Sequence, residues 1–197
     1  MLTTLSTLKS RLAILDTDTQ YDALLTNALN ALGARFDKEC RRTLARTVNA
    51  TQEFDADDTE IRVACYPIES ITRFELKRNE AEGWVEQTNA DFLLRRNCVI
   101  SLASPLGSAD ELARVTYTGG YLLPGTPPPD PPVPACQALP ADLENAAVEQ
   151  VAFWFQNRDL LGIKTVWEYH GTYQQFVAFD LLLSVQSVLN RYTRFTL

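Results

Sequence analysis

Apolar residues at the start of the chain recur every three or four positions, the spacing that gathers side chains on one face of an α-helix. This pattern predicts a first helix over residues 4–15, with Thr3 or Thr4 as its N-cap. It predicts a second helix over about residues 20–44, in which Gly33 would mark a close contact with another helix. The stripe of the first helix is Leu5, Leu8, Leu12 and Leu15, and that of the second is Tyr21, Leu25, Ala28, Leu32, Phe36 and Cys40.

From Thr51 onward the apolar period changes to two, which is typical of β-strands with one buried face. The acidic run Asp55–Asp58 predicts an exposed hairpin turn, and Gly119-Gly120 predicts the end of the last strand. Short strands with regular turns indicate an antiparallel sheet or a small β-barrel. The strand candidates are Glu60–Cys65, Arg73–Lys77, Val99–Leu102 and Ala113–Tyr117.

A proline-rich run follows, since residues 124–140 hold eight of the ten prolines. Proline has a fixed φ and no N–H, so this run predicts an extended, exposed connector. After it the helical period returns and predicts a third helix that starts at Ala141 and a last helix over about Phe176–Tyr192. The buried face of the third helix is expected to carry Leu143, Ala147, Val151, Trp154 and Phe155.

Together these patterns predict an α+β fold in which a helical scaffold carries an inserted β region. Two N-terminal helices in residues 1–50 and two C-terminal helices in residues 141–197 would form one helical domain. The antiparallel β-sheet or small β-barrel would span residues 51–123, and the connector would span residues 124–140.

The composition favours a folded protein that does not bind nucleic acid in general. The hydrophobic fraction of 46% can form a sizeable core. The net charge of −7 suits a surface that DNA passes without adhering. A membrane-spanning helix needs about 18 consecutive apolar residues, and no stretch of this chain approaches that length. The N-terminus lacks the pattern of a signal peptide. We therefore expect no membrane association.

No combination of residues predicts catalysis. The one histidine, His170, has no recognisable nucleophile beside it, and the carboxylates are not paired for acid–base chemistry. The four cysteines have no Cys-x-x-Cys spacing, which predicts reduced thiols rather than a zinc site. The run Asp55–Glu60 lacks the glycine and the distal glutamate of a calcium-binding loop. We expect no enzymatic activity, no metal and no cofactor.

A basic cluster surrounds the end of the second helix. It can complement the helix dipole and pair with acidic neighbours, or it can form a patch that faces another subunit or DNA. The cluster consists of Arg35, Lys38, Arg41, Arg42 and Arg46.

The end of the chain is apolar and also carries arginine and aromatic residues, the types enriched in buried interfaces. This segment either folds onto its own subunit or packs against a partner. The candidate interface residues are Leu182, Val185, Val188, Leu189, Arg191, Tyr192, Arg194 and Phe195.

Several short motifs follow one another along the chain. They are Asp18–Leu25, Cys40–Thr43, Tyr66–Thr72, Val115–Tyr121, Leu139–Leu143, Asn157-Arg158, Val185–Leu189 and Arg191–Arg194. In order and spacing they resemble the head–tail connector (adaptor, or head-completion) proteins of tailed bacteriophages.

The resemblance implies a structural virion protein of the neck, located at the head–tail interface and assembled in the host cytoplasm. About twelve copies would form a homo-oligomeric ring below the portal protein, and genomic DNA would pass through its channel without sequence-specific binding. The C-terminal segment would be the portal-binding interface, and a stopper or tail-completion protein would attach to the ring.

Three alternatives differ in class or position. The chain could be a head-closure (stopper) protein one step further down the neck, or a DNA-binding packaging accessory protein that uses the basic cluster. It could also be a soluble enzyme with an inserted β domain, although no residue points to its chemistry.

Overall fold

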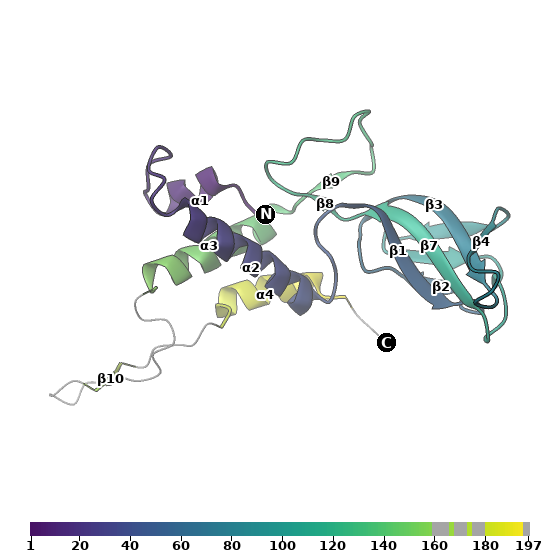
Figure 1. Cartoon of the computed structure of the whole chain (residues 1–197). Helices are drawn as coiled ribbons and strands as arrows, with labels where there is room; N and C mark the ends of the chain where they lie inside the picture. Colours follow the sequence, from purple (N-terminus) through teal and green to yellow (C-terminus); the bar gives the residue numbers. More distant parts are fainter. Residues whose placement is uncertain (159–165, 168–172, 175–179, 195–197) are drawn as a thin grey trace. The chain divides into compact units, whose positions relative to one another are not determined.

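The computed structural model describes residues 1–158, 166–167, 173–174 and 180–194. The described chain is a mixed α+β structure, which confirms the expected class at that level (Figure 1). It divides into two compact units. The helical unit comprises Met1–Cys40 and Leu139–Thr193, and the β unit comprises Arg41–Ala138 together with Arg194.

The helical unit is organised around its third helix. Its helices are α1 (Leu5–Arg11), α2 (Asp22–Cys40), α3 (Ala141–Gln156) and α4 (Leu183–Tyr192). α3 packs against the other three and begins at the predicted residue. Leu143, Ala147 and Val151 are buried on it, as expected, whereas Trp154 and Phe155 are half-buried. A short antiparallel pair, β10 (Val166–Trp167) with β11 (Tyr173–Gln174), also lies in this unit.

The first helix is shorter than its apolar stripe predicts. α1 ends at Arg11, and Ala13 has a left-handed φ of 56° that takes the chain out of the helix. Leu15, which the stripe places on the buried face, is 75% exposed as a result. Thr4 is the N-cap, as expected, because its hydroxyl accepts a hydrogen bond from Thr7 N at 3.1 Å.

The second helix follows its predicted stripe over most of its length. Leu25, Leu32, Phe36 and Cys40 are fully buried, and Leu29, which the prediction omits, is buried with them. α2 ends at Cys40, four residues before the predicted end.

Two further expectations about the helices are wrong. A Cβ on Gly33 would meet no atom within 4 Å, so this glycine does not mark a close helix contact. The last helix begins at Leu183, because residues 180–182 are not helical. Residues 176–179, which the prediction includes, lie outside the described residues.

Two antiparallel sheets make up most of the β unit. The larger has the strand order β1 (Thr47–Asp55), β7 (Leu112–Gly119), β3 (Ile68–Lys77) and β4 (Val85–Gln87). The smaller has the order β2 (Glu60–Arg62), β6 (Val99–Leu102) and β5 (Phe92–Arg95). One hydrophobic core joins them, with Ile61 and Ile100 from the smaller sheet packing with Phe74, Val115 and Tyr117 from the larger. The antiparallel sheet is confirmed; a closed barrel is not, because the strands hydrogen-bond as separate sheets.

The predicted strands agree with the structure to different degrees. β6 has the predicted bounds, and β3 and β7 contain the predicted stretches. β2 ends at Arg62, although Val63 and Cys65 remain buried in the core. The Asp55–Asp58 turn is not a hairpin turn, because β1 pairs with β7 and β2 pairs with β6. This turn instead carries the chain from one sheet to the other.

The proline-rich segment is a loop with most of its prolines exposed, as expected. Its two ends lie side by side, because β8 (Tyr121–Leu122) pairs in parallel with β9 (Gln137–Ala138). Figure 1 shows the chain between these strands leaving and returning at one place. Residues 123–136, called here the proline loop, therefore form a closed loop of the β unit and not an extended connector.

Candidate functional site: assembly surfaces

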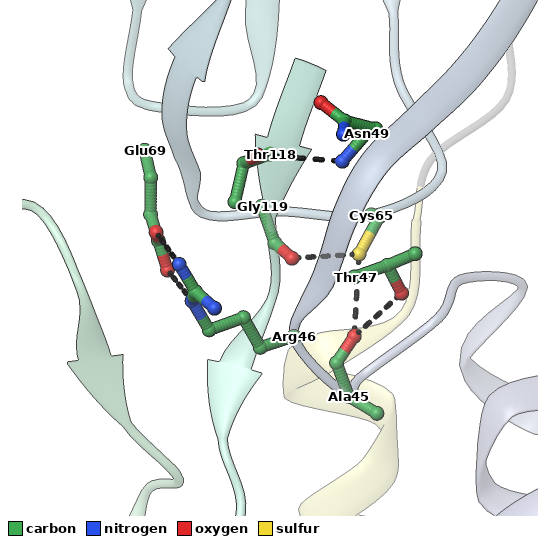
Figure 2. A network of polar contacts seen from close by, with 8 residues as sticks. All are labelled: Ala45, Arg46, Thr47, Asn49, Cys65, Glu69, Thr118 and Gly119. Carbon is green, nitrogen blue, oxygen red and sulfur yellow. Dashed lines mark hydrogen bonds and ion pairs between the residues drawn. The ribbon is translucent and has the colours of Figure 1, made fainter. Parts of the chain in front are cut away.

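An ion pair fixes the segment that enters the β unit. Arg46, just before β1, donates from Nε and Nη2 to the two carboxylate oxygens of Glu69 on β3 at 2.8 and 2.9 Å (Figure 2). The Glu69 side chain is only 1% exposed, so its charge depends on Arg46 for compensation. The hydrogen bonds from this pair raise the pKa of the Arg46 guanidinium.

The backbone beside this ion pair is closely packed. Cys65 Sγ lies 3.0 Å from Gly119 O and 3.3 Å from Ala45 O, and Thr47 Oγ1 donates to Ala45 O at 3.2 Å (Figure 2). A Cβ on Gly120 would lie 2.5 Å from Ala45 O, and the φ of Gly120 is 101°. Glycine is therefore required where β7 ends, for space as well as for conformation.

Arg42 is held inside the β unit by aromatic rings. It is 5% exposed, and its guanidinium carbon lies 3.3 Å from the ring centroid of Tyr66 and 5.2 Å from that of Tyr121. One of its nitrogens also donates to Tyr66 O. A guanidinium enclosed in this way is not presented to DNA.

Cys136, at the returning end of the proline loop, lies against the Arg46–Glu69 pair. Burial, followed by the hydrogen bond and charge of Glu69, raises the pKa of the Cys136 thiol. A raised pKa favours the protonated thiol, which is the less nucleophilic form.

The predicted basic cluster is divided between the two units. Arg35 and Lys38 lie on α2, whereas the other three residues belong to the β unit. Arg35 pairs with Asp180 at 3.5 Å, just as Arg46 pairs with Glu69. These contacts favour pairing with acidic neighbours over a DNA-facing patch. Of the cluster, Lys38 and Arg41 are exposed.

α4 folds onto its own subunit. Val185 and Leu189 are 0% and 2% exposed, and α4 packs against α2 and α3. At its end, Tyr192 Oη donates to Asp142 Oδ1 on α3 at 2.7 Å. Val185 and Leu189, the centre of the predicted interface stripe, are thus buried within the helical unit. This is the alternative given above in which the segment folds onto its own subunit.

The remaining residues of the predicted interface have different environments. Leu182 and Val188 are half-buried, and Arg191 is exposed. Arg194 donates to Arg62 O within the β unit, and Phe195 lies outside the described residues.

Leu183 was missed by the prediction because it falls off the apolar stripe of α4. Its exposure of 83% is the highest among the large apolar side chains of the described chain. An apolar residue on the polar face of an amphipathic helix was the signal that could have identified it.

An apolar groove of about 390 Å³ lies between α2 and α3. Leu24, Ala28 and Ala31 line it from α2, and Trp154 and Phe155 line it from α3. Leu24 is 51% exposed. The indole Nε1 of Trp154 is buried and has no hydrogen-bond partner in the described structure. The groove therefore has apolar walls, and one of the residues that line it carries a buried donor without an acceptor.

Among the described residues, no group of His, Cys, Asp or Glu side chains is placed to hold a metal ion. His170 lies outside them. No helix in the described ranges combines the length and apolar character needed to cross a membrane.

Solved structures match this fold over nearly the whole chain, whereas no protein-family model and no curated protein matches it. One match is a chain in the neck of an empty gene transfer agent (GTA) particle computed with C6 symmetry. The TM-score is 0.60 and the identity 13%, and the match covers 98% of this chain and 89% of that one.

Two further matches come from related assemblies. A chain in the virion of the native GTA particle matches with a TM-score of 0.57 and 14% identity. A chain in the neck of the native GTA particle computed with C12 symmetry matches with a TM-score of 0.56 and 14% identity. Each match covers 98% of this chain and 89% of the other chain. The fold thus occurs in phage-like necks, in agreement with the resemblance to head–tail connector proteins.

Proposed function

We propose that this chain is the head–tail connector (adaptor) subunit of a phage-type neck. Copies of it form a ring, of about twelve subunits by the resemblance, below the portal protein. The ring extends the DNA channel and offers the attachment site for a stopper or tail-completion protein. The observation that carries the proposal is the extent of the fold match, which covers 98% of the chain and so includes both units.

The surface chemistry supports passage of DNA rather than binding to it. The chain has a net charge of −7, and two of its candidate DNA-facing cations, Arg42 and Arg46, are held by partners inside the β unit. These features do not favour a packaging accessory protein that binds DNA. The C6 and C12 symmetries of the GTA necks support a closed ring of identical subunits.

The portal-binding surface is proposed to lie on the outer side of α4. Leu183 and Arg191 are exposed there, and Leu182 and Val188 keep part of their surface accessible. Exposed apolar and arginine side chains on one helix are of the types that gain from burial in a partner.

Electron microscopy of the purified chain mixed with the portal protein of the same genome tests the proposal. A ring of this chain on one face of the portal is expected. A ring attached only in the presence of a separate adaptor would identify a stopper instead. Salt-sensitive binding to DNA without any ring would overturn the proposal in favour of an accessory protein.

A further inference from the structure

The proline loop has the chemistry of a recognition element. Seven of the eleven residues from 124 to 134 are prolines. Five of them are exposed, namely Pro127, Pro128, Pro131, Pro132 and Pro134. Prolines carry carbonyl acceptors but no N–H donors, and their fixed φ lowers the entropy lost when such a segment binds. The loop therefore offers exposed apolar rings together with carbonyl groups that can accept hydrogen bonds.

The base of the loop is anchored to the β unit. β8 pairs with β9, Arg46 N donates to Tyr121 O at 2.8 Å, and Tyr121 N donates to Leu44 O at 2.8 Å. Cys136 packs against the Arg46–Glu69 pair at the returning end. Between these anchors the chain turns twice, with Thr126 N donating to Leu123 O at 3.1 Å and Cys136 N donating to Val133 O at 3.0 Å. The exposed prolines between the two turns are accessible to another molecule.

The groove between α2 and α3 has the complementary chemistry. Its walls are apolar and include Trp154 and Phe155, and aromatic-lined grooves are the surfaces that bind proline-rich segments in other proteins. Its volume of about 390 Å³ lies within the range of small ligand sites. Trp154 Nε1 is a donor without an acceptor, whereas the loop has acceptors and few donors.

We propose that the proline loop of one copy docks into the α2–α3 groove of the next copy in the ring. Side-chain rotamers at interfaces often change on binding, and such a change at Trp154 would direct Nε1 to a prolyl carbonyl. This inference rests on the proposed function, because it requires a ring.

A cyclic ring favours a second copy of this chain as the occupant. In a ring with one rotation axis, one surface of each subunit meets a different surface of its neighbour. A projecting loop on the β unit and a groove on the helical unit are two such surfaces. Repeated around the ring, the contact would join every copy to the next.

Disulfide cross-linking between copies tests the contact. In a background that carries Cys98→Ser and Cys136→Ser, so that no partly exposed native thiol remains, one preparation carries Thr126→Cys in the loop and the other carries Ala31→Cys at the groove. Both positions are exposed. The mixed ring, oxidised and run on a non-reducing gel, should give a covalent dimer that neither preparation gives alone. The matched control replaces Thr126→Cys with Ser108→Cys, which lies in another exposed loop of the β unit and should give no dimer.

The outcomes separate this inference from the proposed function. Rings without the dimer would overturn the loop–groove contact and leave the function standing. If no ring forms, both fail. A chain that carries both cysteines and cross-links only within itself would overturn docking between copies.

Two milder variants provide a second measurement. Trp154→Phe keeps an aromatic side chain in the wall of the groove but removes the Nε1 donor. It should weaken assembly of the oligomeric ring about three- to tenfold. A Pro127→Ser and Pro128→Ser double variant should weaken it by a similar factor without changing the fold of the β unit. Assembly of both variants at the wild-type concentration would contradict the proposal.

Discussion

Gln150 of α3 caps the start of α4 through Leu182. Leu182 N donates to Gln150 Oε1 at 2.8 Å, and Gln150 Nε2 lies 3.4 Å from Asp180 O. Gln150 is fully buried, and α4 has no side-chain cap from its own N-cap residue, which is Leu182. A side chain from another helix thus satisfies the backbone at the point where the chain re-enters the helical unit.

Replacing Gln150 with Met should therefore destabilise the helical unit. The variant leaves Leu182 N and Asp180 O without their partner, which costs about 1–3 kcal/mol in the free energy of unfolding. Urea denaturation of the full chain, followed by far-UV circular dichroism, measures this. Gln156→Met on the exposed face of the same helix is the control and should change the free energy by less than about 0.5 kcal/mol. Equal effects of the two substitutions would refute the capping role.

The buried Tyr117 predicts a loss of stability at alkaline pH. Burial raises the pKa of its hydroxyl above the usual 10.0, and Cys65 N donates to this hydroxyl at 3.1 Å. The folded state therefore holds the proton more tightly than the unfolded state. The resulting stabilisation is fully present below pH 10 and is lost as the pH rises through the higher folded-state value.

A Tyr117→Phe variant separates this titration from the rest of the protein. At pH 8 it should be less stable than the wild type by about 1–3 kcal/mol, because Cys65 N loses its acceptor. The difference should narrow as the pH rises above the usual tyrosine value. Denaturation curves between pH 8 and 11 measure it, and a constant difference would rule out a raised pKa.

The Arg46–Glu69 pair should be more sensitive to the loss of one partner than of both. Arg46→Met leaves a nearly inaccessible carboxylate without compensation and should cost about 3–5 kcal/mol. The double variant Arg46→Met, Glu69→Met should be less destabilised than this single variant. A double-mutant cycle on the full chain measures the coupling, and additive losses would show that the pair is not a unit.

Two neighbouring positions of α4 should separate folding from portal binding. Leu183→Asp changes a side chain that is 83% exposed, so stability should change by less than about 0.5 kcal/mol while portal attachment weakens. Val185→Asp buries a charge and should lose more than about 3 kcal/mol. Thermal unfolding and sedimentation with the portal protein measure the two effects. Normal portal attachment by Leu183→Asp would remove this part of α4 from the interface.

Local patterns predicted the elements whose side chains face one continuous core. The alternation in Val99–Leu102 located β6 at its true bounds, and Pro140 with the returning helical period located the start of α3. The same reasoning missed β4 and β5, where exposed apolar residues such as Val85 and Leu93 interrupt the alternation expected of a strand. It extended the first helix through Leu15 because the spacing of leucines carries no information about the φ of Ala13.

The candidate surfaces depended on contacts between residues that are distant in sequence. The spacing of Val185 and Leu189 shows that they share a face, but whether this face meets α3 or another molecule is a tertiary property. The basic cluster looked continuous in sequence, yet the partners of Arg42 and Arg46 lie more than twenty residues further along the chain. The parallel pairing that closes the proline loop likewise has no local signature.

The closure of the proline loop by β8 and β9 separates its length from the rest of the architecture. β9, where the loop ends, is paired with β8, where the loop begins. Residues added or deleted between 123 and 136 therefore need not displace the sheets or the start of α3. Gly120, by contrast, tolerates no side chain, since a Cβ there would contact Ala45 O at 2.5 Å. Chains that share this fold should consequently differ in the length of this loop while keeping a glycine at the position of Gly120. The proposed contact with a neighbouring molecule could then change through insertions in the loop, with the two sheets and α3 unchanged.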